Sequence, residues 1–120
     1  MPVIDDGPIH TLARFLDLTV MRSKLVTSNM ANIDTPAYRT RDIDFRFELE
    51  RAQGDFELAV LPPAVRQVQG LIERPDGNNV SLERESLLPA DLQLRFNTGV
   101  QLLRDRFKTL SSAIHEGSTS

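Results

Sequence analysis

The chain has 120 residues, of which 40% are hydrophobic and 26% charged, and its formal net charge is -3. This is one domain's worth of chain, and an aromatic content of only 6% indicates a thin core. Lysines and arginines are interspersed with acidic residues and form no basic stripe, which argues against nucleic acid as a partner. No apolar run approaches the roughly 20 residues that span a bilayer, so membrane insertion is not expected.

Residues 1–8 contain Pro2, Gly7 and Pro8, and we expect them to form a flexible lead. They show no basic segment followed by an apolar one, so the sequence predicts no cleaved signal peptide. The chain has no cysteine, which excludes disulfides, thiolate metal sites and cysteine nucleophiles.

From residue 9 to residue 33 the apolar side chains are spaced as in an amphipathic helix. They form two adjoining stripes, one with Leu12, Leu16 and Val20 and the other with Leu18, Met21 and Leu25. One partner helix covers one seam, and uncovered apolar surface costs free energy in water. The sequence therefore predicts that this helix also packs against another chain.

Residues 34–88 give a weaker signal, and we expect a connecting arm followed by a small irregular or β-containing segment. Pro36 lacks an N–H and disfavours a helical Thr35, so the first helix should end before it. Apolar residues from Ile43 to Leu49 alternate with polar ones as in a strand, while a helix over residues 44–53 is the competing interpretation. Residues 56–60 alternate again, and Pro-Asp-Gly-Asn at residues 75–78 predicts a turn.

The last third of the chain carries a near-heptad apolar pattern that predicts a helix over residues 89–116. Its members are Leu92, Phe96, Val100, Leu103, Phe107, Leu110 and Ile114. Gly117 should end this helix and leave residues 117–120 as a flexible tail. Alternatively, the helix begins early through a cap at Ser81, and Pro89 then kinks it. Gly99 marks either a close approach of another helix or a tolerated defect.

These patterns predict a mainly α protein. Its long N- and C-terminal helices should pair as a coiled-coil-like hairpin, with a small irregular or β-containing middle segment.

No catalytic, cofactor-binding or metal-binding set stands out, so enzymatic activity is not expected. His10 and His115 lack a third ligand at a suitable spacing, which disfavours a zinc site. Hydroxyl side chains of the first helix (Ser23, Thr27 and Ser28) have no nearby base. Asp42 and Asp44 resemble an Asp-x-Asp metal motif but lack the ligand series of a calcium loop. We expect them to be solvated and paired with Arg39, Arg41 or Arg46.

The most informative segment is residues 28–45, where the first helix stops and the connecting arm begins. Short polar side chains there can bond the backbone groups that a helix end leaves open. We interpret the segment as a junction that fixes the direction of the arm against a neighbouring subunit. Its members are Asn29, Ala31, Asn32, Asp34, Thr35, Pro36, Tyr38, Arg41, Asp42, Ile43, Asp44 and Phe45.

This junction resembles a signature of bacterial flagellar axial proteins, whose first helix ends in Ala-Asn before a Thr, a Gly-Tyr or Gly-Phe pair and a basic residue. Here the signature is matched by residues 29–32 and 35–39. Residues 41–45, Arg-Asp-Ile-Asp-Phe, narrow the resemblance to basal-body rod proteins of the proximal type. Residues 76–85 and the C-terminal helix also match, so the resemblance covers residues 9–116. Ala37 stands where the family usually has glycine, and a positive φ there would be strained.

The resemblance implies a structural subunit of the flagellar rod that polymerises through its terminal helices and transmits torque in the periplasmic space. It implies export in an unfolded state through the flagellar type III apparatus. Implied partners are copies of the chain, other rod proteins and the basal-body adaptor protein. Another axial protein or a cytosolic coiled-coil binding module remains the alternative, with a small metal-dependent enzyme as a distant third.

Overall fold

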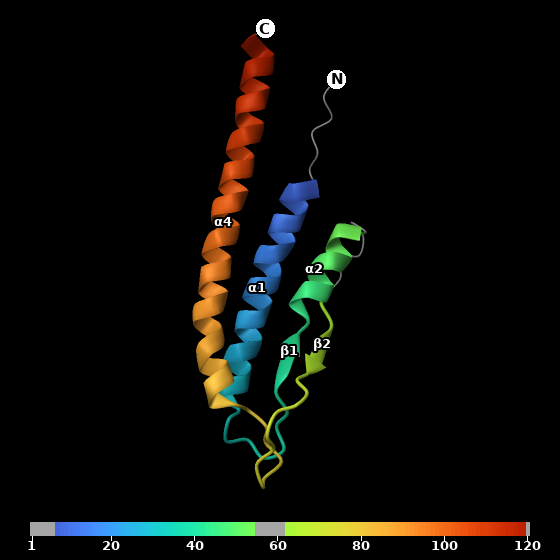
Figure 1. Ribbon diagram of the computed structural model, residues 1–120, viewed down its shortest axis with the longest axis vertical. Helices are drawn as coiled ribbons and strands as arrows, with labels where there is room; N and C mark the ends of the chain where they lie inside the picture. Colours follow the sequence, from blue (N-terminus) through green and yellow to red (C-terminus); the bar gives the residue numbers. More distant parts are fainter. Residues whose placement is uncertain (1–6, 55–61, 120) are drawn as a thin grey trace.

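The computed structural model describes residues 7–54 and 62–119, and the molecule is elongated, with extents of 71 × 26 × 18 Å (Figure 1). Its elements in chain order are α1 (Gly7–Ala31), β1 (Arg41–Ile43), α2 (Phe45–Gly54), β2 (Val65–Gln67) and α4 (Leu82–Thr119). The prediction of a mainly α protein with two long terminal helices and a small β-containing middle is confirmed.

The two long helices run antiparallel, and α1 lies between α4 and α2 (Figure 1). At Gly99 of α4, a β-carbon would come within 2.8 Å of Leu16 Cδ2 and 2.9 Å of Phe15 Cδ1. Glycine is therefore required by the close approach of α1, and the alternative of a tolerated defect is wrong.

At one end of the hairpin α1 and α4 stop at nearly the same height, whereas at the other end α4 extends beyond α1. Because Gly99 lies beside Phe15 and Leu16, the start of α4 lies near the level of the last residues of α1. At the other end, α4 continues for about twelve residues, or about 18 Å, past the level of Gly7. Figure 1 shows this stretch, which we call the α4 overhang (residues 108–119), rising beyond the start of α1.

α4 begins at Leu82, so the predicted start at residue 89 is wrong and the alternative of an early start is right. Ser81 supplies the cap, since its Oγ accepts the backbone N–H of Arg84 at 3.2 Å and its carbonyl accepts that of Glu85 at 3.0 Å. The helix passes through Pro89, whose ring cannot offer an N–H to the carbonyl four residues earlier. It continues to Thr119, so Gly117 does not end it as expected.

The middle segment contains a two-stranded antiparallel sheet in which Arg41 pairs with Gln67 and Ile43 with Val65. The predicted strand over residues 43–49 is wrong beyond Ile43, and the competing helix is right, because α2 begins at Phe45. Asp44 caps α2 by accepting the backbone N–H of Phe47 on its Oδ1 at 3.0 Å. The alternation predicted at residues 56–60 lies outside the described residues.

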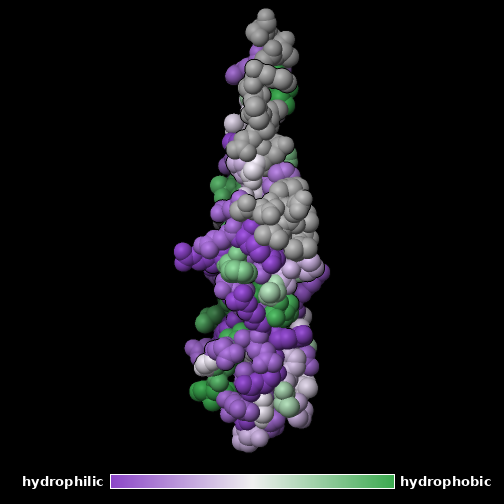
Figure 2. Space-filling model, turned by 90° about the vertical axis from the view of Figure 1, so that its right-hand side faces the viewer, coloured by the Kyte–Doolittle hydropathy of each residue, from purple (hydrophilic) through white to green (hydrophobic). Residues whose placement is uncertain are grey.

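In the described part of the chain the interior is more polar than apolar. Its buried apolar side chains are Leu18, Val26, Ile43, Val80 and Leu92, together with Pro63. Its buried polar or charged side chains are Arg14, Thr19, Asn29, Thr40, Asp42, Glu48, Asn78, Asn79 and Glu85. The outer side of α2 and the sheet is also largely hydrophilic, with hydrophobic groups in small separate patches (Figure 2). The fold therefore depends on specific polar contacts as much as on a hydrophobic core.

Candidate functional site

The turn after α1 is closed by its own polar side chains, as the sequence predicts. Asn32 Nδ2 donates to the carbonyl of Ser28 at 2.7 Å, which satisfies a group that the helix end leaves open. Thr35 Oγ1 donates to Asn32 Oδ1 at 3.0 Å, and the Thr35 backbone N–H donates to the Asn32 carbonyl at 3.0 Å. Pro36 follows directly and prevents a return to helix. Ala31, Asp34 and Pro36 lie exposed on this turn.

Asn29 connects α1 to the strand that follows the turn. It is fully buried and bonds both backbone groups of Arg41, donating to its carbonyl at 2.8 Å and accepting its N–H at 3.1 Å. The Tyr38 hydroxyl donates to Asn29 Oδ1 at 2.9 Å, and Asn29 Nδ2 also lies 3.3 Å from Glu85 Oε1 of α4. One amide side chain therefore joins α1, β1 and α4.

A second segment, residues 74–80, closes over the junction from outside. Asn78 Nδ2 donates to the carbonyls of Asn32 at 2.9 Å and Thr35 at 2.8 Å. Asn79 Oδ1 accepts the Thr40 backbone N–H at 2.6 Å. The turn predicted at residues 75–78 positions these side chains: Gly77 has a φ of 85° and its N–H donates to the Arg74 carbonyl at 2.9 Å.

We call the buried side chains that lock this junction the polar clasp: Asn29, Thr40, Asp42, Asn78, Asn79 and Glu85. The sequence reasoning placed Asn29 and Asp42 in the junction but missed the other four. The signal for two of them was present in Asn78-Asn79, because asparagines directly after a turn often bond backbone groups of a neighbouring segment.

Asp42 is buried rather than solvated, and its expected partners are wrong. It binds Arg22 of α1 through two contacts, Nε to Oδ1 and Nη2 to Oδ2, both at 3.0 Å. Its Oδ2 also accepts from Arg84 of α4, whose other terminal nitrogen binds Glu85. Asp44 is exposed, but its ion-pair partner is Arg66 of β2 at 3.7 Å. Asp42 therefore links α1, β1 and α4 through charge, as Asn29 does through its amide.

Glu48 provides a similar link between α1 and α2. Its carboxylate is buried and lies 2.8 Å from Arg51 and 3.8 Å from Arg14. Its Oε1 accepts the backbone N–H of Ala64 at 3.0 Å, which holds the segment leading into β2. On the same side of α1, Phe15 packs edge-on against Phe45 with ring centroids 5.2 Å apart. Arg95 of α4 covers the Phe45 ring at 5.3 Å.

Ala37 adopts a φ of 62°, which is the strained left-handed conformation considered for this residue from its sequence position. Its N–H donates to the Asp76 carbonyl at 2.8 Å, and a β-carbon on Gly77 would lie 3.2 Å from the Ala37 α-carbon. The contact with residues 76–77 therefore holds Ala37 in place.

The predicted helix seam divides into a covered part and an uncovered part. Leu18 and Leu92 are buried, and most other members are half-buried: Leu12, Leu16, Met21, Leu25, Phe96, Val100, Leu103 and Leu110. Phe107 and Ile114 are 53% and 60% exposed. Ile114 lies on the α4 overhang, past the first residue of α1, and Phe107 lies at the level of that first residue. Among the described residues, both side chains are therefore largely uncovered. Their role in assembly stays a prediction.

Among residues 7–54 and 62–119, no group of three or more His, Asp or Glu side chains could hold a metal ion. In the same residues, no helix combines the length and apolarity needed to cross a membrane. The described arrangement offers long helical surfaces and a rigid junction.

Known proteins similar to this chain carry one consistent name. The flagellar basal body rod protein FlgB of Cereibacter sphaeroides is 39% identical over 115 residues, covering 85% of this chain and 89% of that protein. FlgB of Salmonella typhimurium is 31% identical over 133 aligned positions, covering 94% of this chain and 96% of that protein. The chain belongs to the FlgB family of flagellar basal body rod proteins.

FlgB of Escherichia coli is also similar, at 28% identity with 94% of this chain and 96% of that protein covered. No family model matches the chain. Membership of the FlgB family confirms the resemblance drawn from residues 29–45.

Proposed function

We propose that this chain is a non-catalytic structural subunit of the proximal flagellar rod, which polymerises through α1 and α4 into the periplasmic shaft that transmits torque. FlgB family membership supports the place in the basal body. The assembly through α4 is supported by its apolar row, which continues past α1 with the same spacing; Phe107 at the level of the start of α1 and Ile114 beyond it are both exposed.

Exposed apolar side chains in a regular row are costly unless a partner covers them, at about 25 cal/mol per Å² of apolar surface. Phe107 and Ile114 are seven residues apart, so they lie on one face of α4. At about 100° per residue, this face lies about 40–60° around the helix from the buried Leu92. An apolar face that extends beyond the helix's own partner is suited to packing against another subunit.

The polar interior supports the proposed route to the rod. Only Pro63 and five aliphatic side chains are buried apolar groups among the described residues, and a chain with so small a core has a low free energy of unfolding. This property suits export in an unfolded state through the flagellar type III apparatus without a cleaved signal peptide. Partners would be copies of the chain, other rod proteins, the basal-body adaptor protein and the export apparatus. Long helices with many small contacts suit torque transmission.

The test is a pair of substitutions in the α4 overhang, each expressed in cells that lack the native gene. Ile114→Asp places a charge on the exposed apolar face and should abolish rod formation and swimming. Ser112→Asp adds the same charge about 200° around the helix and should leave swimming intact. Since both positions are exposed in the subunit, both variants should keep the helical circular dichroism of the parent chain.

Normal swimming by cells that carry Ile114→Asp would contradict assembly through this end of α4. Recovery of the parent chain with purified basal bodies separates a rod subunit from a cytosolic coiled-coil module, which would stay in the soluble fraction.

A further inference from the structure

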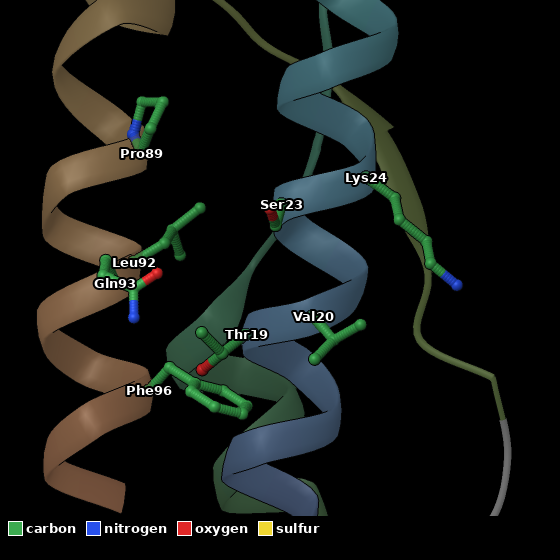
Figure 3. Close-up of a pocket in the computed structure, with 8 residues that line it drawn as sticks. All are labelled: Thr19, Val20, Ser23, Lys24, Pro89, Leu92, Gln93 and Phe96. Atoms are coloured by element: carbon green, nitrogen blue, oxygen red, sulfur yellow. The ribbon is translucent and has the colours of Figure 1, made fainter.

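A groove of about 390 Å³ lies between α1 and α4 (Figure 3). It is lined by Thr19, Val20, Ser23, Lys24, Pro89, Leu92, Gln93 and Phe96. Figure 3 shows Leu92 and Phe96 extending from α4 toward α1, while the Lys24 amine points away from α4. Val20 is 42% exposed at this groove. The groove therefore presents an apolar floor with polar groups beside it.

The groove lies on a side of α1 turned away from the described residues of α2 and β1. The α1 residues that contact α2 and β1 include Arg14, Phe15, Arg22 and Asn29. Val20 and Ser23 lie on a different part of the helix circumference, at least about 80° from Phe15 and Arg22. Two packed helices with an open apolar groove between them offer a position for a third helix.

The α4 wall of the groove and the α4 overhang belong to one stripe. Pro89 and Phe96 are seven residues apart on the groove side of α4, and Phe107 and Ile114 repeat this spacing at the other end. At about 100° per residue, all four lie within about 20° of one another around the helix. The apolar surface of the overhang is thus a direct continuation of the α4 wall of the groove.

We propose that the end of α4 in one copy, Phe107 together with the α4 overhang, inserts Phe107, Leu110 and Ile114 into the α1–α4 groove of a second copy. This inference rests on the proposed function and specifies which surfaces meet. A second copy is the occupant because its α4 carries an exposed apolar row, Phe107 and Ile114, that continues the apolar face of α4 lining the groove. The groove also leaves Val20 of α1 exposed, where an inserted helix would contact it.

The contact joins two different surfaces of the same chain, so it is heterologous and propagates from copy to copy instead of closing on itself. The groove centres near residue 93 of α4 and the overhang near residue 112. Successive copies would therefore be displaced by about 28 Å along the helix axis. Such a stagger gives a filament, as a rod subunit requires.

The absence of native cysteine allows a clean cross-linking test with the purified full chain. We would mix Val20→Cys with Ile114→Cys under a mild added oxidant and measure the disulfide-linked mixed dimer by mass spectrometry. The expected yield is several-fold higher than for Val20→Cys mixed with Ser112→Cys. The reason is that a disulfide requires α-carbons about 4.4–6.8 Å apart and Ser112 faces the other way.

Equal yields from the two mixtures would overturn the proposal. So would preferential pairing of Ile114→Cys with itself, which indicates closed pairing of two overhangs. A mixed Val20→Cys/Ile114→Cys dimer that forms only after removal of residues 2–6 would mean that these residues of the same chain cover the overhang. That result would also overturn the proposal. These results leave the proposed function standing if the chain is still recovered with basal bodies. Its loss from basal bodies would instead contradict the function itself.

Discussion

The polar clasp and the outer part of α4 (residues 101–116) are opposite kinds of surface in one chain. The clasp residues are at most 8% exposed, and their side chains, or in Thr40 the backbone N–H, bond groups of other segments. In the outer part of α4, Leu103, Arg106 and Leu110 are half-buried and the other residues are exposed. Hydrogen bonds require defined directions, whereas apolar burial does not. The subunit thus fixes its own geometry at one end and leaves adaptable surface at the other.

The largest effect is expected for Asn78→Asp, which breaks the clasp without changing the size of the side chain. The new oxygen would face the carbonyls of Asn32 and Thr35, which now accept from Nδ2, and a buried charge would be added. We expect the free energy of unfolding to fall by about 3 kcal/mol or more, measured by urea denaturation.

The matched control for this prediction is Asn97→Asp on the exposed side of α4. Asn97 Oδ1 accepts from Gln93 Nε2 at 3.0 Å, and an aspartate keeps that acceptor in water. Its effect should stay within about 0.5 kcal/mol. Similar losses for the two variants would mean that the clasp is no more important for stability than the helix surface.

A smaller loss is expected for Asp42→Asn, which removes the charge between Arg22 and Arg84. Two guanidinium groups that are mostly buried would lose their common carboxylate, so we expect a loss of about 2 kcal/mol in thermal or urea denaturation. Asp105→Asn makes the same change where Oδ1 accepts from Gln101 on the exposed face of α4, and it should cost less than about 0.5 kcal/mol. A neutral Asp42→Asn would contradict the view that this ion cluster holds the three elements together.

The smallest change, and the one of opposite sign, is expected for Ala37→Gly. A left-handed alanine costs about 1–2 kcal/mol, and glycine recovers this strain less its own entropy loss of about 0.5–1 kcal/mol. The free energy of unfolding should therefore rise by about 0.5 kcal/mol. Ala113→Gly in the outer part of α4 should not stabilise the chain, since glycine disfavours helix. A rise for both variants, or a fall for Ala37→Gly, would refute the assignment of strain to residue 37.

The helices were predictable because they carry their signal in apolar spacing, which any packed helix must show. The close approach at Gly99 and the turn at residues 75–78 were also accessible, since glycine in a helix and Pro-Asp-Gly-Asn have few physical explanations. The early start of α4 was visible only as an alternative, because Pro89 outweighed the cap at Ser81.

The clasp was mostly hidden because polar residues give no sequence signal of burial. Asn78, Asn79 and Glu85 look like ordinary loop and helix-surface residues until their partners, more than 38 residues away, are placed beside them. α2 was misjudged for a related reason. Its buried side chain is the charged Glu48, so α2 does not show the apolar spacing of a helix. The apolar residues around Glu48 instead alternate with polar ones, which is the pattern of a strand.

The long sequence separations in the clasp also set an order of folding. Asn29 and Glu85 are 56 residues apart, and Asn32 and Asn78 are 46 apart, so their contacts close large loops at an entropic cost. Helical turns in α1 and α4 form from neighbouring residues and need no such closure. We therefore expect the slow step of folding to be the closure of these loops by the clasp contacts. Asn29 of α1 can form its contact with α4 only after Glu85 has been synthesised and brought beside it.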